Sequence, residues 1–251
     1  WRSYRARKFA KIYDEIFLLF NFEKKYFDFK NLKKTFIGHP IFHIKERKIK
    51  KNYKYISFLP GSRQNEVLKL IKYFNHIEEY INKNKLNFKI FIPTLPHLSS
   101  LIEENTKLWK TDTIISTDMS KFDDYFEYVY ISITCSGTAS LEIAKRNIPQ
   151  IIIYKLNYFT EILLKPFVKV KYANLINIIS NQMIIPEILN SKLSEKKLLN
   201  NFLKLFNSKK RQEKQINSIN IYLKEIVNEF SPYDVSINRI NKLINPSSKA
   251  N

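Results

Sequence analysis

Glycine is nearly absent from this chain of 251 residues, which contains three: Gly38, Gly61 and Gly137. Average usage of about 7% would supply many more. Because glycine adopts positive φ freely and lets the backbone approach a ligand closely, its retention at so few positions marks them as special. Each lies in a short polar cluster, Gly38-His39-Pro40, Pro60-Gly61-Ser62-Arg63 or Ser136-Gly137-Thr138. We therefore expect the function to lie at these clusters.

Cysteine is also scarce. The single Cys135 excludes an internal disulfide and is typical of a protein from a reducing compartment. It ends a predicted strand, where a small buried residue is suitable, and no base lies near it in the sequence, so we assign it no nucleophilic role. His39 and His43 have the i, i+4 spacing of a metal pair, but Pro40 keeps His39 out of helical geometry. The sequence therefore predicts no metal site and no cofactor.

Long apolar runs are absent as well, since no stretch approaches the roughly 20 residues needed to span a bilayer. The candidate for contact with a membrane surface is the segment 158–175, where apolar residues mix with lysines, although a helix packed on a sheet explains the same pattern. The net charge of +20 fits solvated helix faces, an anionic membrane surface or nucleic acid. Because the lysines are spread over helix faces, and Lys, Ile, Asn, Phe and Tyr are inflated together, we expect no nucleic-acid partner.

Two of the glycine clusters follow a predicted strand and precede a predicted helix. The strand, turn and helix are residues 54–59, 60–62 and 65–82 in the first case and 128–134, 136–138 and 140–146 in the second. A helix N-terminus offers unpaired N–H groups and a partial positive charge, which suit an anion. Arg63 stands at the entrance of the first helix, where its guanidinium can grip a phosphate. Two such turns can hold one nucleotide, although turn geometry and capping alone explain either turn.

Glu66 and Glu142 are each predicted in the first turn of one of these helices. A carboxylate there is stabilised by the helix dipole, which by itself explains both residues. The alternative is that they accept hydrogen bonds from ribose or sugar hydroxyls, as acidic residues do in dinucleotide-binding folds.

The ordered set of motifs resembles the lipid-A-disaccharide synthase family. Pro60-Gly61-Ser62-Arg63-x-x-Glu66 is followed by Ser136-Gly137-Thr138-x-x-Leu141-Glu142-x-Ala144, Pro149, Tyr154-Lys155, Asn177-Ile178-Ile179 and Pro186-Glu187-Ile188-Leu189. Upstream, Trp1-Arg2-x-x-Arg5, Asp14, Phe22-Glu23 and Phe36-Ile37-Gly38-His39-Pro40 are similar to mid-chain landmarks of the same family, in the same order. The resemblance covers essentially the whole chain.

The resemblance implies an α/β protein of GT-B type, in which two Rossmann-like domains face a cleft. The implied reaction joins UDP-2,3-diacylglucosamine to 2,3-diacylglucosamine 1-phosphate without a metal, and gives the lipid A disaccharide 1-phosphate and UDP. It implies a cytoplasmic enzyme, peripheral on the anionic inner-membrane surface of a Gram-negative-type bacterium. The resemblance also implies which residues bind the donor: Gly61, Ser62, Arg63, Glu66, Ser136, Gly137, Thr138, Ser140, Glu142, Tyr154 and Asn177. Gly38 and His39 are expected at the cleft or hinge.

We expect three segments: residues 1–45 as the end of an N-terminal acceptor domain and hinge, 46–230 as the UDP-sugar donor domain, and 231–251 as a C-terminal helix and tail. The family's Gly-rich acceptor loop and the Asp proposed as its general base have no counterpart in this sequence. We therefore expect an N-terminally truncated chain and name no catalytic residue.

Two other interpretations stay open at this point. The chain could be another UDP-sugar enzyme of similar fold, either a transferase or an epimerase, or it could be an inactive remnant that binds UDP. The apolar residues of the last third of the chain have helical spacing that fits either a core or a subunit contact, so a homodimer stays open as well: Leu198, Phe202, Phe206, Ile216, Leu223 and Ile226.

Overall fold

The structure is a computed structural model that describes residues 5–44, 46–47, 52–135, 137–155 and 171–245. Its contacts divide the chain into two compact units, one comprising Trp1–Ile44 with Ile221–Asn251 and the other Lys45–Asn220. The segment 231–251, predicted as a separate C-terminal piece, thus groups with the N-terminal unit.

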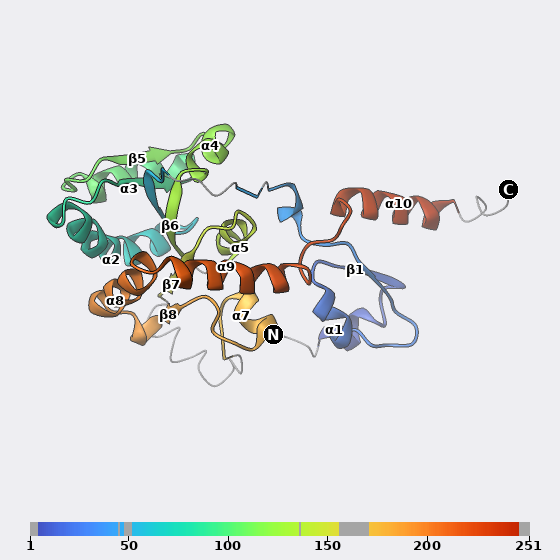
Figure 1. The fold of residues 1–251 in the computed structure, drawn as a ribbon. Helices are drawn as coiled ribbons and strands as arrows, with labels where there is room; N and C mark the ends of the chain where they lie inside the picture. Colours follow the sequence, from blue (N-terminus) through green and yellow to red (C-terminus); the bar gives the residue numbers. More distant parts are fainter. Residues whose placement is uncertain (1–4, 45, 48–51, 136, 156–170, 246–251) are drawn as a thin grey trace. The chain divides into compact units, whose positions relative to one another are not determined.

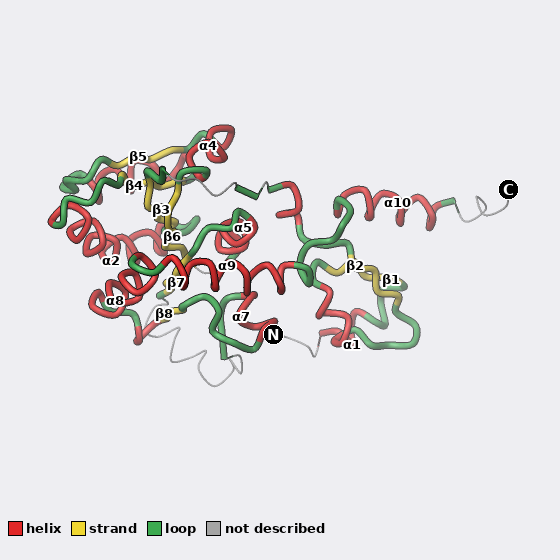
Figure 2. The backbone as a smooth tube through the Cα atoms, in the orientation of Figure 1, coloured by secondary structure: helices red, strands yellow, loops and turns green. Residues whose placement is uncertain are grey.

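The larger unit is built on a six-stranded parallel sheet (Figure 2). The strands are β3 (Tyr55–Leu59), β4 (Lys89–Pro93), β5 (Thr113–Ser116), β6 (Val129–Cys135), β7 (Gln150–Tyr154) and β8 (Glu187–Leu189). Their order across the sheet is β5-β4-β3-β6-β7-β8. The chain therefore builds outward from β3 to one edge, then returns to place β6 on the other side of β3. This is the order of a Rossmann-like fold, which confirms the predicted α/β class.

Helices cover both faces of this sheet (Figure 1). They are α2 (Gln64–Lys83), α3 (Ser99–Thr106), α4 (Phe122–Phe126), α5 (Thr138–Lys145), α7 (Leu175–Ser180), α8 (Glu195–Phe206) and most of α9 (Lys209–Leu223), with short 3-10 helices at Pro96–Leu98, Met119–Lys121 and Asn190–Lys192. The strands and helices predicted around the two glycine turns correspond to β3, α2, β6 and α5.

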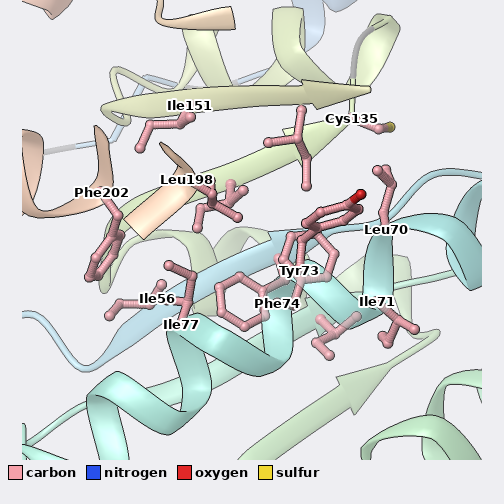
Figure 3. Close-up of a cluster of buried hydrophobic side chains, with 14 of the residues drawn as sticks. Ile56, Leu70, Ile71, Tyr73, Phe74, Ile77, Cys135, Ile151, Leu198 and Phe202 are labelled. Carbon is pink, nitrogen blue, oxygen red and sulfur yellow. The ribbon is translucent and has the colours of Figure 1, made fainter. Parts of the chain in front are cut away.

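Alternation along the strands places buried apolar side chains on both faces of the sheet, and among the described residues each face has its own cluster. On one face, Phe58 of β3 stacks on Phe74 of α2 with ring centroids 4.6 Å apart. Leu198 and Phe202 of α8 belong to the same cluster as Phe74 (Figure 3). On the other face, Phe91 packs with apolar residues of the α4–α5 region. Each large apolar side chain that is fully buried contributes roughly 1.5–3 kcal/mol, so these clusters hold the layers together.

Two expectations about apolar positions are settled by this packing. Four of the six residues are buried within the chain, Leu198, Phe202, Leu223 and Ile226, which confirms the core alternative for these four, whereas Phe206 and Ile216 are half-buried. Leu68, one of the apolar residues whose spacing predicts the helix over 65–82, is instead 47% exposed, while Leu70 is buried. The reason is angular, since Leu70 lies nearer than Leu68 to the stripe formed by Val67, Ile71 and Phe74.

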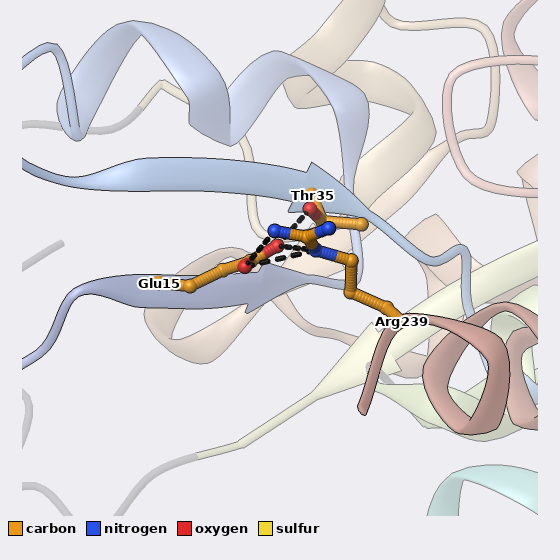
Figure 4. A network of polar contacts seen from close by, with 3 residues as sticks. All are labelled: Glu15, Thr35 and Arg239. Carbon is orange, nitrogen blue, oxygen red and sulfur yellow. Dashed lines mark hydrogen bonds and ion pairs between the residues drawn. The ribbon is translucent and has the colours of Figure 1, made fainter. Parts of the chain in front are cut away.

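The smaller unit contains a two-stranded parallel sheet of β1 (Glu15–Leu18) and β2 (Lys33–Phe36). It also contains α1 (Arg5–Phe9), α10 (Pro232–Ile244) and 3-10 helices at Asn21–Tyr26 and Pro40–His43. Arg239 of α10 binds the Glu15 carboxylate through Nε at 2.7 Å and Nη2 at 2.7 Å, and the Thr35 hydroxyl donates to the same carboxylate (Figure 4). Because the Glu15 side chain is 7% exposed, this pair anchors the C-terminal helix to β1.

Candidate nucleotide site

The two predicted glycine turns meet at the centre of the larger sheet. Gly61 follows β3 and Gly137 follows β6, and these strands are neighbours with Leu59 beside Thr134. The direction of strand addition reverses between them. In open α/β sheets, ligands bind outside the carboxyl ends of the strands at such a switch point. Two segments far apart in the sequence therefore form one candidate site.

The first turn carries a charged pair. Gly61 has φ +115°, and Arg63, with an extended backbone, is the residue that precedes α2. Its Nη1 donates to Glu66 Oε1 at 2.7 Å, and this bond raises the pKa of the Arg63 guanidinium. Glu66 lies in the first turn of α2, as predicted. Ser62, the residue between Gly61 and Arg63, is exposed. Arg63 is thus at the helix entrance, as expected, and a carboxylate already holds its guanidinium.

The second turn faces open space. Gly137 has φ +127° and ψ −153°, a conformation that is essentially restricted to glycine. No described heavy atom outside its chain neighbours would lie within 4 Å of a Cβ built there. Thr138 begins α5 directly, while Ser136 lies outside the described residues. Glu142 was predicted in the first turn and this was wrong, because α5 begins two residues earlier than expected and Glu142 falls in its second turn.

Three further side chains lie where the neighbouring strands end. Tyr154 ends β7, and burial, followed by the charge of Glu66, raises the pKa of its phenol. Cys135 ends β6 and is buried, which raises the pKa of its thiol to about 12 and confirms the expectation of a small buried residue. Lys155, to which the sequence analysis gave no role, donates from Nζ to the Tyr73 hydroxyl at 2.7 Å. Its position directly after a strand is the signal that could have identified it.

Ser140 and Asn177, both predicted to bind the donor, are buried in a hydrogen-bond network. Asn174 Nδ2 donates to Ser140 Oγ at 2.6 Å. Asn177 Nδ2 donates to the carbonyl of Ile185 and to Glu187 Oε1, both at 2.7 Å, and its Oδ1 accepts from the Ile185 N–H at 2.9 Å. In this structure both side chains therefore support α5 and α7.

Gly38 and His39 belong to the smaller unit. Gly38 has φ +86°, and a Cβ there would lie 2.9 Å from the backbone N of Asn228, so this position requires glycine. His39 is extended, as expected of a residue before proline, and its Nδ1 accepts from the Ile41 N–H at 3.2 Å. Its ring stacks on Phe20, and burial lowers its pKa. Their cleft role stays a prediction.

Two observations concern metals and membranes. Across the described ranges, no three His, Cys, Asp or Glu side chains gather as a metal site requires. Nor does any helix there combine the length and apolarity of a membrane span. Residues 158–170 of the predicted membrane segment lie outside the described residues.

The family model and the curated relatives that match this chain belong to the same family. The family described as lipid-A-disaccharide synthetase matches residues 1–233. The chain is 29% identical over 231 residues to the lipid-A-disaccharide synthase of Rhodospirillum centenum, a match that covers 87% of this chain and 57% of the relative. To that of Rickettsia felis it is 34% identical over 239 residues, covering 89% and 60%.

A solved structure described as a Staphylococcus aureus MnaA–UDP complex superposes with a TM-score of 0.61 at 13% identity, covering 96% of this chain and 64% of that one. The structural neighbours are GT-B glycosyltransferases and epimerases, which confirms the GT-B type of fold. The chain spans between about half and two thirds of the length of the curated relatives it matches. Since the family match extends over nearly all of its residues, this chain belongs to the lipid-A-disaccharide synthase family.

Proposed function

We propose that this chain carries the UDP-sugar donor site of a hexosyltransferase of lipid A biosynthesis. The observation that carries the proposal is the pair of positive-φ glycines, Gly61 and Gly137, that follow neighbouring parallel strands at the switch point. Family membership supports the reaction, and the UDP named for the S. aureus MnaA structure supports the nucleotide.

In the proposed reaction, the donor is UDP-2,3-diacylglucosamine and the acceptor is 2,3-diacylglucosamine 1-phosphate. The bond between the anomeric carbon and the diphosphate oxygen breaks, and UDP leaves with the electron pair. The acceptor 6-hydroxyl forms the β-1,6 bond to that carbon and gives up its proton to a base. We assign no residue of this chain as the base.

The leaving diphosphate gains negative charge, and the proposed site opposes that charge. The first N–H groups of α2 and α5 follow the two glycines, and a helix N-terminus attracts anions. Arg63 adds a guanidinium whose planar donors match phosphate oxygens. Preorganised donors of this kind stabilise developing charge in a transition state, and we propose that they replace a metal here.

The remaining donor contacts follow from position. The hydroxyls of Ser62, Thr138 and Tyr154 lie at the carboxyl ends of β3, β6 and β7, where we propose that they donate to the nucleotide. Glu142 stays our proposed acceptor for ribose hydroxyls.

We also propose that the protein associates with the anionic inner-membrane surface. The proposed substrates carry acyl chains, and the net charge is +20. Each Lys or Arg close to an anionic leaflet contributes about 1 kcal/mol, so a subset of these cations suffices.

Calorimetry with UDP, UMP and uridine tests the donor site. We expect affinity to fall in that order, because each phosphate removed takes away contacts to the helix N-termini and Arg63. A folded protein that does not bind UDP, or binds uridine equally well, contradicts the site. The reaction itself is tested by supplying both lipid substrates and measuring disaccharide formation.

A further inference from the structure

A groove of about 340 Å³ lies between α8, α9 and the loop that precedes β8. Cations from both helices line it, Lys204 from α8 and Arg211 and Lys214 from α9. The loop contributes an apolar wall that includes Met183 and Ile184. No Asp or Glu is among the lining residues, so the groove joins positive charge to an apolar surface.

Hydrogen bonds to the backbone fix the elements that line this groove. Gln215 is 5% exposed, accepts from the Gln150 N–H at 2.7 Å and donates to the Gln150 carbonyl at 3.0 Å. Gln212 donates to the Leu205 carbonyl at 2.9 Å and so fixes α9 to α8. Both amides are used by the protein, and the groove is therefore preformed.

The three cations have no described carboxylate as an ion-pair partner, in contrast to Lys209 on the same helix, which pairs with Glu213 at 3.9 Å. All three side chains are exposed, and Met183 beside them is 60% exposed. Like charges along one groove repel each other, and a bound anion removes that repulsion. The groove thus presents the features of an anion site.

Its location separates it from the proposed donor site. The loop with Met183 precedes β8, and Gln150, which Gln215 binds, is the first residue of β7. The groove is therefore at the amino-terminal edge of the parallel sheet, whereas Gly61 and Gly137 lie at the carboxyl edge.

We infer that this groove binds the phosphate group of an anionic phospholipid. Arg211 suits bidentate contact with phosphate oxygens, and Lys204 and Lys214 add point charges. The apolar wall suits the first carbons of a phospholipid's acyl chains, which free phosphate lacks. This inference rests on the proposed membrane association and names the residues that perform it.

Two triple variants of equal charge test the groove. One is Lys204→Gln, Arg211→Gln, Lys214→Gln; the control is Lys83→Gln, Lys107→Gln, Lys110→Gln, three exposed lysines elsewhere on the same unit. Flotation is measured with phosphatidylcholine vesicles, with and without phosphatidylglycerol, at constant ionic strength. We expect the groove variant to lose about a hundredfold in binding to the anionic vesicles and the control only a few-fold. UDP calorimetry on both variants verifies folding independently.

The outcomes separate the alternatives. An equal loss in both variants shows diffuse charge and overturns the groove while leaving membrane association standing. If the wild-type protein shows no preference for anionic vesicles, both the groove assignment and the proposed membrane association are overturned. UDP binding would still support the donor site in that case. Calorimetry with inorganic phosphate distinguishes the ligand. Tight phosphate binding that the groove variant loses, with vesicle binding unchanged, identifies a free-phosphate site and overturns the lipid assignment.

Discussion

Arg63 donates from Nη1 to Oε1 of Glu66 at 2.7 Å, one helical turn apart at the start of α2. The same carboxylate lies over Gly61, where a Cβ would be 2.6 Å from Glu66 Oε2. An anion of the protein is thus already placed against the turn and the guanidinium that we propose for the diphosphate. In the proposed site, Glu66 and the diphosphate would therefore compete for Arg63.

Arg63→Ala should weaken UDP binding by about tenfold to a hundredfold, as expected for loss of a hydrogen bond to a charged group. Because the Arg63 side chain is 76% exposed, its removal should leave the melting temperature nearly unchanged. Calorimetry with UDP measures the first effect and thermal unfolding the second. Arg63→Lys should restore affinity only in part, since an ammonium lacks the bidentate geometry. Unchanged UDP affinity in Arg63→Ala would remove Arg63 from the site.

Glu66→Gln should tighten UDP binding by about two- to fivefold, because it removes a competitor for Arg63 and a negative charge beside the diphosphate. The matched control is Glu103→Gln in α3, whose carboxylate accepts from the Ser99 hydroxyl, and we expect no change there. Weaker binding by Glu66→Gln would instead favour the sugar-hydroxyl role considered for this residue.

Substitution by alanine should have different effects at the two glycines, Gly61 and Gly137. Both substitutions strain a backbone with positive φ, which costs about 1–3 kcal/mol of stability each. At Gly61 the new methyl also displaces the Glu66 carboxylate, whereas at Gly137 it enters open space. Where that space holds ligand, Gly137→Ala should lose at least about tenfold in UDP affinity, equivalent to 1.4 kcal/mol. Full UDP affinity in a folded Gly137→Ala protein would exclude ligand from that space.

Glu15 should make the smaller unit sensitive to acid. The hydrogen bonds from Arg239 lower the pKa of Glu15 below its ordinary value of 4.5, so the pair stabilises the fold above that pH. This contribution is lost as the pH falls through the lowered pKa of the folded state. Glu15→Gln should therefore lower the melting temperature at neutral pH, and its difference from wild type should shrink in acid.

The control for this pH dependence is Asp28→Asn. Asp28 pairs with Lys34 at 2.7 Å but is 85% exposed, and exposed ion pairs contribute little. A difference between wild type and Glu15→Gln that is constant with pH would contradict the assignment to Glu15.

Cys135 should be unreactive in the native protein. Burial raises the pKa of its thiol to about 12, and the thiolate is the reactive form. A thiol reagent at slightly alkaline pH should label the protein only after denaturation, which a spectrophotometric assay measures. Rapid labelling of native protein would show that the end of β6 opens to solvent.

The sequence identified the strand–turn–helix units because their signals are local. A β-branched or aromatic strand, a glycine turn and an amphipathic helix each depend on neighbouring residues, so β3, α2 and β6 were predicted closely. The helix that contains Glu142 was placed too late, since Gly137 itself precedes its first turn and no side chain marks the boundary. The motifs that contain Ser140 and Asn177 did not predict that these side chains are buried. Their hydrogen-bond partners, Asn174 and Glu187, come from other segments of the chain.

The sequence by itself determined the family, the fold class and the few positions where glycine is required, since these depend on residue type and order along the chain. Only the tertiary structure placed Gly61 beside Gly137, because strand order, which no local signal encodes, makes β3 and β6 neighbours. It likewise joined Glu15 to Arg239 across the length of the chain and gathered Lys204, Arg211 and Lys214 of two helices around one groove. Each of these is a contact in space, and its energy depends on distance and burial rather than on sequence spacing.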